Sequence, residues 1–518
     1  MNQRSNSKEL TFFKSLSFLA RAIKLLRDAS CIFHWAAENN PASSEARGNN
    51  PSPKDANPDS FAVNNPVKKI LFLTHYFPPE VNAPASRTYE HAKRWVQAGH
   101  EVTVITGFPS HPHGRVYEGY RRKLWQWEEM DGIKVLRVWT FISANKGFFR
   151  RILNYFSFMK SAGFFGMFVK RPDAVIATSP QFFCAIAGWW LSLIRWRPFV
   201  FELRDLWPES IVAVGAMKRG LIIRSFECIE NFLYKRARLI ISVTESFKKT
   251  LMERGIPEEK IKVVTNGADL DFFNPEKVSP TANSSQPADS QKDDNGSLGS
   301  SDPGSKEAVR GQPSVPVLSN VEGVSDPRIK NSGDFFLCGY IGTIGMAHKV
   351  ETMVEAADLL RDEPDIRLFI LGDGAERTYI ESLIKEKALD TVDLFPMVPK
   401  KEMLAYLAAC DAVAVLLRKN DLFRTVIPSK IFEAMAMKKP IIMGVEGEAR
   451  EIAEQADCCI PIEPENPDEL ANAVKRLKND PDECTRLGTN GRKAVEERYN
   501  RDTLADRMLE YIEGIVKN

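Results

Sequence analysis

The chain has 518 residues, a length that exceeds a single hydrophobic core and predicts two or three domains. Apolar residues make up 43% of it and charged residues 27%, as in an ordinary soluble globular protein. The net charge of +2 gives no indication of general nucleic-acid binding, and the eight cysteines show no CxxC pair or zinc-ligand spacing. We therefore expect a reduced, cytoplasmic setting and no nucleic-acid partner.

The N-terminal extension, residues 1–66, is expected to be largely disordered. Residues 38–66 are rich in Asn, Pro and Ser, a composition that cannot build a core. Residues 9–27 mix Phe, Leu and Ile with four basic side chains, and no apolar run there is long enough to span a bilayer. This segment is either a basic amphipathic helix on an anionic membrane or a helix that is frayed or covered by a partner.

The first domain is expected over residues 67–278. A short apolar run at residues 68–76 is typical of a buried parallel strand, and a loop (77–86), a helix (87–97) and a second strand (100–106) follow it. This order predicts a βαβ unit and a doubly wound parallel sheet. Because such sheets bind ligands beyond the carboxyl ends of their strands, the loop is a candidate ligand-contacting segment.

Two apolar stretches of the first domain require a choice between a core and a membrane. Residues 182–194 are too few to cross a bilayer, so we expect a buried helix. Residues 147–171 form either a helix partly covered by the domain or a patch that faces a membrane. The basic residues among its aromatic ones are Arg150, Arg151, Lys160, Lys170 and Arg171.

A second domain is predicted after an insert. Residues 279–333 contain no aromatic residue, Cys or Met but many Ser, Pro, Asp and Gly, so we expect a flexible insert. From residue 334 to 495, strand and helix patterns alternate and predict another parallel sheet wrapped by helices. Amphipathic helices close the chain, the last of them over residues 496–518.

A helix start is the clearest local signal of this second domain. Pro428 and Ser429 precede an apolar helical face, and Ser is a favoured N-cap. Such a start attracts anions such as a diphosphate, and Glu433, one turn on, is placed to accept hydrogen bonds from a sugar diol. The alternative is an ordinary capped amphipathic helix with a solvent-facing Glu.

The stretch PSKIFEAMAMKKPII, residues 428–442, resembles the donor-nucleotide segment of family 4 glycosyltransferases, especially enzymes of O-antigen and exopolysaccharide biosynthesis. The resemblance extends, with interruptions, from about residue 68 to the end of the chain. It implies the α/β GT-B fold, in which two Rossmann-like parallel-sheet domains face a cleft. It also implies that the last helix crosses back to the first domain.

The resemblance implies a donor-nucleotide site built on glycine turns and on the helix after Pro428. Thr343 and His348 stand where many members carry an Arg and a Lys that grip the diphosphate, and Thr425 replaces the first of two usual glutamates. Arg418, Lys419, Arg424 and Lys430 could supply the missing positive charge. The expected donor residues are Gly342, Thr343, Gly345, His348, Gly372, Gly374, Arg424, Ser429, Lys430 and Glu433.

In the first domain, FELRDLWPES resembles the segment where other members have a His-Asp pair, so Arg204 and Asp205 are the catalytic candidates. They form either a plain surface ion pair or a group that holds the acceptor and steadies charge at the anomeric carbon. His75, Glu80 and Pro84 are the acceptor-side candidates, although a lone His is more often structural.

The expected activity is that of a retaining hexosyltransferase. It would move a sugar from a nucleotide sugar, UDP-linked by preference, to a lipid-linked or growing saccharide acceptor. Two alternatives remain: a nucleotide-sugar epimerase or hydrolase on the same fold, and a catalytically silent assembly scaffold. We expect no metal, because His111 and His113 have no Cys or carboxylate set nearby and no DxD-like pair lies at a strand end of the expected donor site. The expected place is the cytoplasm, with peripheral contact at the inner face of the plasma membrane.

Overall fold

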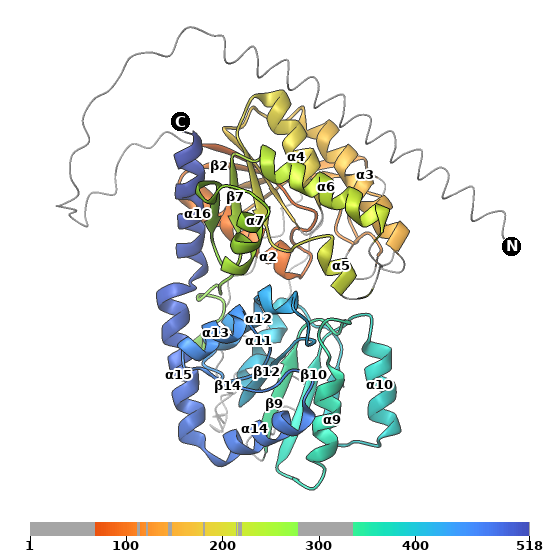
Figure 1. The fold of residues 1–518 in the computed structure, drawn as a ribbon, viewed down its shortest axis with the longest axis vertical. Helices are drawn as coiled ribbons and strands as arrows, with labels where there is room; N and C mark the ends of the chain where they lie inside the picture. The colour runs from red at the N-terminus through yellow and green to blue at the C-terminus, as the bar shows by residue number, and fades with distance from the viewer. Residues whose placement is uncertain are drawn as a thin grey trace, which may run out of the picture. The chain divides into compact units, whose positions relative to one another are not determined.

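The computed structural model describes residues 68–110, 114–120, 123–142, 148–179, 182–213, 215, 220–277 and 335–516 (Figure 1). These described residues all belong to one compact unit. The expectations for residues 1–66 and 279–333, and for His111 and His113, concern positions outside the described residues.

The first domain is built on an eight-stranded sheet in the order β3-β4-β2-β1-β5-β6-β7-β8, counted over the described residues. Every pairing is parallel except that of the edge strand β3 with β4. The apolar runs of β1 and β5 are buried because helices cover both faces of the sheet. The strands are β1 (Lys69–Leu73), β2 (Glu101–Gly107), β3 (Trp125–Met130), β4 (Ile133–Val138), β5 (Ala174–Thr178), β6 (Phe199–Leu203), β7 (Leu239–Ser242) and β8 (Ile261–Val263).

The helices of this domain follow the predicted alternation. The first, α2, begins earlier than residue 87 because the Asn82 side chain accepts a hydrogen bond from the N–H of Ala85 (2.9 Å) and Pro84 occupies the first turn. The run at 182–194 is the predicted helix. The helices are α2 (Ala83–Gln97), α3 (Phe148–Gly166), α4 (Phe182–Arg195), α5 (Glu209–Ala213), α6 (Leu221–Arg236) and α7 (Glu245–Glu253), with 3-10 turns at Glu258–Lys260 and Pro275–Lys277.

The second domain holds a parallel sheet of six strands in the described part of the chain, in the order β11-β10-β9-β12-β13-β14. Buried apolar clusters lie on its two faces. The strands are β9 (Phe336–Ile341), β10 (Ile366–Leu371), β11 (Val392–Phe395), β12 (Ala412–Leu416), β13 (Ile441–Gly444) and β14 (Cys459–Pro461). The helices are α9 (Glu351–Leu359), α10 (Arg377–Glu386), α11 (Lys400–Ala409), α12 (Lys430–Ala436), α13 (Glu448–Gln455), α14 (Pro467–Asn479), α15 (Pro481–Arg498) and α16 (Arg501–Val516), with a 3-10 turn at Phe423–Thr425.

The last helix, α16, packs against α2 of the first domain (Figure 1). The indole N–H of Trp95 donates to the carbonyl of Ala505 (2.9 Å), and Arg94 forms a two-point ion pair with Asp506 (2.8 and 2.7 Å). Met508 is buried in the same apolar cluster as Trp95. The predicted fold class, two doubly wound parallel-sheet domains, is confirmed.

Candidate functional site

The two glycine turns of the second domain lie against one another at the carboxyl ends of β9 and β10. The N–H of Gly342 donates to the carbonyl of Leu371 (2.9 Å), and that of Ile344 donates to Asp373 (2.9 Å). A Cβ on Gly372 would overlap the carbonyl oxygen of Gly342, and one on Gly374 would overlap that of Ile344. Glycine is therefore required at positions 372 and 374 because the two turns touch there.

Lys430 lies beside the first of these turns. Its Nζ is 3.8 Å from the centroid of the Tyr340 ring and would be 3.0 Å from a Cβ on Gly342. This Nζ is buried and has no hydrogen-bond partner among the described residues. Burial lowers the pKa of Lys430 to about 7. A buried ammonium without a partner is unfavourable, so the position is suited to an anionic ligand.

The side chain of His348 lies near Lys430 at the same turn. Its backbone N–H donates to the carbonyl of Gly345 (2.8 Å), while its Nδ1 is buried without a hydrogen-bond partner among the described residues. Burial, and then the charge of Lys430, lowers the pKa of His348 to about 3. A neutral imidazole therefore stands next to the ammonium. Thr343 is exposed on the same turn, and its carbonyl accepts from the Tyr340 hydroxyl (2.7 Å).

The start of α12 differs from the prediction in one respect. Ser429 has helical backbone angles (φ −61°, ψ −26°), and its side chain makes no capping hydrogen bond. The N–H groups of Ile431 and Phe432 donate to the carbonyls of Pro428 (3.2 Å) and Ser429 (3.1 Å), so the first turn closes on its own backbone. Ser429 is thus not the predicted cap. For the attraction of an anion to this turn, the positive charge of Lys430 would contribute more than the dipole of so short a helix.

Glu433, one turn into α12, lies at the junction of the two domains. Burial raises its pKa, and the nearby Lys400 and Arg501 oppose that shift. Lys400 and Arg501 both pair with Glu90 of α2, the former at 3.0 Å. In addition, the side-chain amide of Asn266 donates to the carbonyl of Ile427 (3.5 Å). The first turn of α12 therefore stands next to the first domain.

The other basic residues proposed for the donor site do not gather at one point. Arg424 is exposed, and Lys419 pairs with Glu463, so Lys419 does not join Lys430. Arg418 is closer to the glycine turn, because its backbone N–H donates to the carbonyl of Ala347 (2.8 Å). At the position of the missing glutamate, the Thr425 hydroxyl donates to the carbonyl of Leu422 (2.6 Å) and stabilises the local turn.

Arg204 and Asp205 do not pair with each other, so the plain surface ion pair considered from the sequence is wrong. The Arg204 guanidinium donates to the carbonyl of Pro84 (3.2 Å), and burial lowers its pKa to about 10. Burial raises the pKa of Asp205 to about 6, and a hydrogen bond with Ser210 opposes that shift. The N–H of Arg204 donates to the hydroxyl of Ser179 (2.7 Å), which fixes the strand end.

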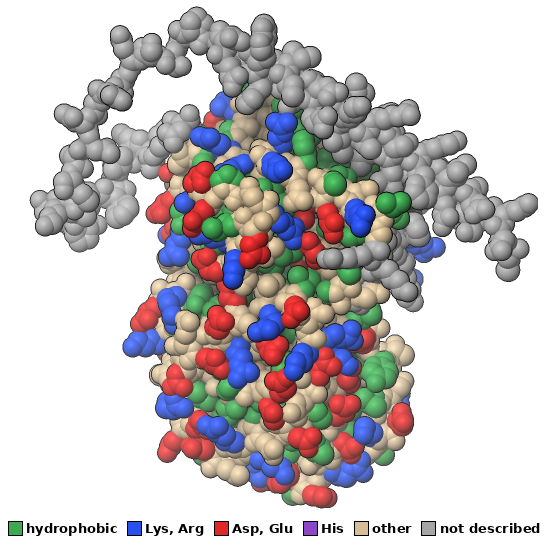
Figure 2. All heavy atoms as spheres, viewed as in Figure 1, with side chains coloured by type: hydrophobic (Ala, Val, Ile, Leu, Met, Phe, Trp, Pro, Cys, Tyr) green, Lys and Arg blue, Asp and Glu red, His purple; other side chains and the backbone are tan. Residues whose placement is uncertain are grey.

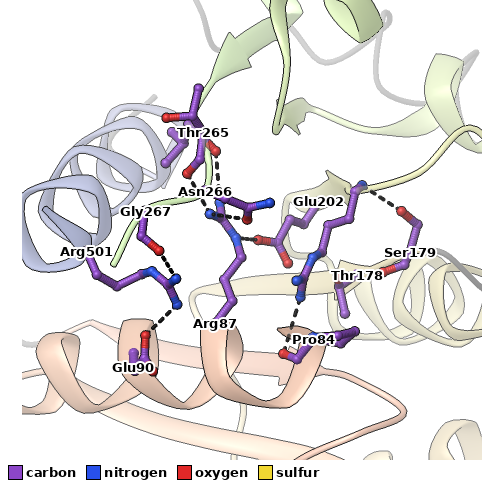
Figure 3. A network of polar contacts seen from close by, with 12 residues as sticks. Pro84, Arg87, Glu90, Thr178, Ser179, Glu202, Thr265, Asn266, Gly267 and Arg501 are labelled. Carbon is purple, nitrogen blue, oxygen red and sulfur yellow. Dashed lines mark hydrogen bonds and ion pairs between the residues drawn. The ribbon is translucent and has the colours of Figure 1, made fainter. Parts of the chain in front are cut away.

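A buried ion pair that sequence reasoning missed supports this strand end (Figure 3). Arg87 of α2 pairs with Glu202 of β6 at 2.8 Å, and both side chains are almost fully buried. Arg87 also donates to the carbonyls of Val264 (2.9 Å) and Thr265 (2.7 Å), so it joins three segments of the first domain. The sequence did offer one signal of this ion pair. Glu202 lies within the apolar strand FVFEL, and a buried carboxylate requires a cation nearby.

Two of the three acceptor-side candidates make contacts that stabilise the loop. His75 is buried against Tyr155 and Phe158 of α3, with ring centroids 5.3 and 4.9 Å apart. Glu80 is buried and accepts a hydrogen bond from the N–H of Ser110 (2.9 Å). Pro84, in contrast, lies at the start of α2 and accepts from Arg204.

Two family models match the chain and together cover most of both domains. "Glycosyl transferase 4-like domain" matches residues 82–267, and "Glycosyl transferases group 1" matches residues 325–494. The chain belongs to the family 4 glycosyltransferases. The predicted family and enzyme class are thus confirmed.

One relative and two solved structures of similar fold match this glycosyltransferase over most of their length. The putative colanic acid biosynthesis glycosyl transferase WcaI of Escherichia coli K12 is 23% identical over 418 residues, which are 79% of this chain and 91% of WcaI. HepE of Anabaena, solved with UDP and glucose, has a TM-score of 0.58 at 16% identity, covering 86% of this chain and 99% of that one. WaaG, a glycosyltransferase involved in lipopolysaccharide biosynthesis, has a TM-score of 0.55 at 14% identity, covering 86% and 100%.

The described part of the glycosyltransferase contains no group of three or more His, Cys, Asp or Glu that could hold a metal ion. Likewise, none of its described helices is long and apolar enough to cross a membrane. A cavity of about 550 Å³ lies in the first domain next to α5 and α6. It is lined by Glu209, Gly220, Leu221, Ile223, Arg224, Glu227, Asn231 and Arg254.

Proposed function

We propose that this glycosyltransferase is a retaining enzyme of cell-surface polysaccharide biosynthesis. It transfers a sugar from a nucleotide sugar, UDP-linked by preference, to a lipid-linked or growing saccharide acceptor. The observation that carries the proposal is the buried Nζ of Lys430, which has no hydrogen-bond partner among the described residues and lies beside Gly342. The reported roles of WcaI and WaaG, and the UDP bound to HepE, support the pathway and the donor class.

On the donor side, the diphosphate would occupy the space beside Gly342. Breaking the anomeric bond builds negative charge on the diphosphate, and Lys430 would stabilise that leaving group at a site where the charge is only weakly screened. The neutral His348 would complete the contact by a hydrogen bond. Glu433 would accept hydrogen bonds from the ribose diol. No metal ion is required for these contacts, because a side chain supplies the positive charge.

On the acceptor side, Arg204 and Asp205 stand at the carboxyl end of β6. Asp205 would orient the acceptor hydroxyl or steady the positive charge that develops at the anomeric carbon. Arg204 would hold the start of α2 against this strand end through Pro84. A same-face path retains the anomeric configuration without a covalent enzyme intermediate. A lipid-linked acceptor would bring the protein, as a peripheral protein, to the inner face of the plasma membrane.

A thermal-shift panel of nucleotide sugars tests donor binding. A ligand that binds only the native state raises stability by RT ln(1 + [L]/Kd), so the donor is expected to give the largest rise in Tm. The same donor, incubated with a lipid-linked saccharide, should release nucleoside diphosphate only when the acceptor is present. NMR of the product should show the anomeric configuration of the donor.

Three results would overturn this proposal. A new sugar nucleotide formed without an acceptor would identify an epimerase. Release of free sugar without an acceptor would identify a hydrolase. Donor binding without turnover on any lipid-linked acceptor would favour the silent scaffold, the alternative motivated by Thr425 and Arg204.

A further inference from the structure

The surface of α3 and the residues after it has an unusual composition. Residues 148–171 contain five basic residues and no acidic one. Along α3 the exposed positions include Arg150, Leu153, Lys160 and Phe164, which follow helical spacing and form one outward stripe. Leu153 is 47% exposed and Phe164 is 54% exposed. Figure 2, in contrast, shows acidic and basic side chains interspersed over the visible face of the second domain.

Aromatic rings extend this stripe across the edge of the domain. Phe168, just beyond α3, is 73% exposed and packs against Phe164 with ring centroids 5.5 Å apart. Phe164 contacts Phe165 (5.2 Å), which in turn contacts Trp125 of the edge strand β3 (6.5 Å). Trp127, the next outward residue of β3, is also exposed. The rings of Trp125, Phe165, Phe164 and Phe168 therefore form one connected apolar row.

The end of α4 adds a further aromatic ring. The Arg195 guanidinium donates to the carbonyls of Met167 and Val169, the latter at 2.8 Å, and so ties the end of α4 to the segment after α3. The next residue, Trp196, is 70% exposed and has a positive φ of 54°. A positive φ is unfavourable for so bulky a residue, yet the fold holds this indole outward. We call this surface the aromatic–basic face; it comprises Trp125, Trp127, Leu153, Lys160, Phe164, Phe168, Lys170, Arg171 and Trp196.

We propose that the aromatic–basic face binds the surface of an anionic phospholipid bilayer. Exposed Trp and Phe side chains favour the boundary between headgroups and acyl chains, and Lys and Arg are attracted to anionic headgroups. Exposed apolar side chains that lie next to one another often mark a surface that contacts a membrane or another protein. Of the basic side chains, Lys170 lies 3.7 Å from Glu101 but is 74% exposed, so its ammonium can still reach a headgroup.

The position of α3 connects this face with the acceptor side. The inner face of the same helix carries Tyr155 and Phe158, which pack on His75 at the end of β1. The side chain of Asn154 donates to the carbonyl of Phe141 (2.7 Å), which fixes α3 to the chain that leaves β4. A bilayer bound to the outer side of α3 would therefore lie one helix away from the acceptor-side loop. The inference deepens the proposed function by adding the surface that meets the lipid.

Vesicle co-sedimentation of the full chain tests the proposal. The probes are vesicles of phosphatidylcholine alone and vesicles that also contain phosphatidylglycerol. An aromatic variant carries Trp125→Gln, Phe164→Gln and Phe168→Gln, and a basic variant carries Lys160→Gln, Lys170→Gln and Arg171→Gln. The matched control carries Leu359→Gln, Tyr379→Gln and Lys401→Gln, three exposed positions of the second domain.

The wild type and the control should bind the anionic vesicles more tightly than the neutral ones. The aromatic variant should lose at least about tenfold in affinity for both kinds of vesicle, because it buries less apolar surface. The basic variant should lose about tenfold or more for anionic vesicles only, and its remaining binding should depend little on salt. Thermal melting of each variant confirms that it folds.

The proposal is overturned if both variants bind the vesicles as the wild type does, which would place membrane contact elsewhere, for instance in residues 1–66. It is also overturned if neither the wild type nor the control binds vesicles. Donor binding, measured by thermal shift, and turnover of a water-soluble acceptor analogue are independent of vesicles. These two assays therefore separate a failure of this inference from a failure of the proposed function.

Discussion

The ammonium group of Lys430 lies 3.8 Å from the centroid of the Tyr340 ring. A cation above an aromatic face is attracted to it, but the ring cannot accept the hydrogen bonds that three N–H donors offer. The buried ammonium therefore lacks hydrogen-bond acceptors among the described residues. A diphosphate beside Gly342 would supply oxygen acceptors and a compensating charge.

Replacing Lys430 by Met should weaken donor binding. The loss of one charge-assisted hydrogen bond corresponds to about a 10- to 100-fold rise in Kd for a nucleoside diphosphate. The Kd for the nucleoside alone should not change, because the nucleoside has no phosphate. Isothermal titration calorimetry measures both constants. Lys438→Met, at the exposed lysine just beyond α12, is the control, and an unchanged diphosphate affinity in Lys430→Met would contradict the assignment.

The pKa of Lys430 predicts how donor affinity depends on pH. Because burial holds this pKa at about 7, the amine of the free protein is largely neutral above that pH. Binding an anion then requires uptake of a proton, so Kd should rise by up to about tenfold per pH unit above about pH 7. Lys430→Arg should make the affinity nearly independent of pH in this range. A flat profile in the wild type would show that Lys430 does not meet the diphosphate.

The lowered pKa of Lys430 also makes the stability of the ligand-free protein depend on pH. The folded pKa lies below the unfolded value of 10.5, so the unfolded state binds more protons between the two values. The contribution of Lys430 to the free energy of unfolding therefore increases as the pH rises from about 7 towards 10. Urea denaturation across this range should show the rise in the wild type and a smaller one in Lys430→Met.

Replacing Glu433 by Ala should raise the donor KM by at least about tenfold, because a carboxylate that binds a ribose diol makes charge-assisted hydrogen bonds. Unlike Lys430→Met, this change should weaken binding of the nucleoside and of the nucleoside diphosphate equally. Steady-state kinetics and calorimetry provide the two measurements. The matched control is Glu451→Ala, at an exposed carboxylate of α13. Wild-type kinetics in Glu433→Ala would count heavily against the donor site.

Asp205→Asn should lower kcat by about 100-fold or more if the carboxylate acts in its charged form at the reaction centre. Since burial raises the pKa of Asp205 to about 6, wild-type activity should fall as the pH drops through about 6. Ser210→Ala removes a hydrogen bond that opposes this shift and should move the acid limb to higher pH. A pH–rate profile without that limb, or one that Ser210→Ala leaves in place, would remove Asp205 from the mechanism.

A carboxylate of the second domain caps a helix of the first. Glu448 accepts from the N–H groups of Glu245 (2.9 Å) and Ser246 (2.8 Å) at the start of α7, and from the Ser246 hydroxyl (2.6 Å). Thr244 remains as the N-cap of α7 in Glu448→Ala, but the two N–H groups lose a charged acceptor, so the free energy of unfolding should fall by about 1–2 kcal/mol. Urea denaturation measures this change, and Glu451→Ala should leave it within about 0.5 kcal/mol of the wild type. Faster hydrogen exchange at residues 245 and 246 should accompany the loss.

Local patterns were sufficient to predict the two sheets. Short apolar runs alternate with helical faces from residue 68 onwards, and a buried parallel strand must be apolar on both sides. The same reasoning predicted an apolar helical face after Ser429, and in α12 that face is buried at Ile431, Phe432 and Met435. It did not predict the role of Ser429, because whether a Ser caps depends on backbone angles that the neighbouring elements impose.

By itself, the sequence determined the fold class, the family and the segments that carry the candidate donor site, since these depend on periodicity and on residues close together in the chain. Only the tertiary structure decided where the side chains point. It directs Arg204 towards Pro84, joins Arg87 to Glu202, and leaves Lys430 beside Gly342 without a hydrogen-bond partner among the described residues. Such contacts join residues far apart in sequence, so their geometry depends on how whole elements pack and not on any local pattern.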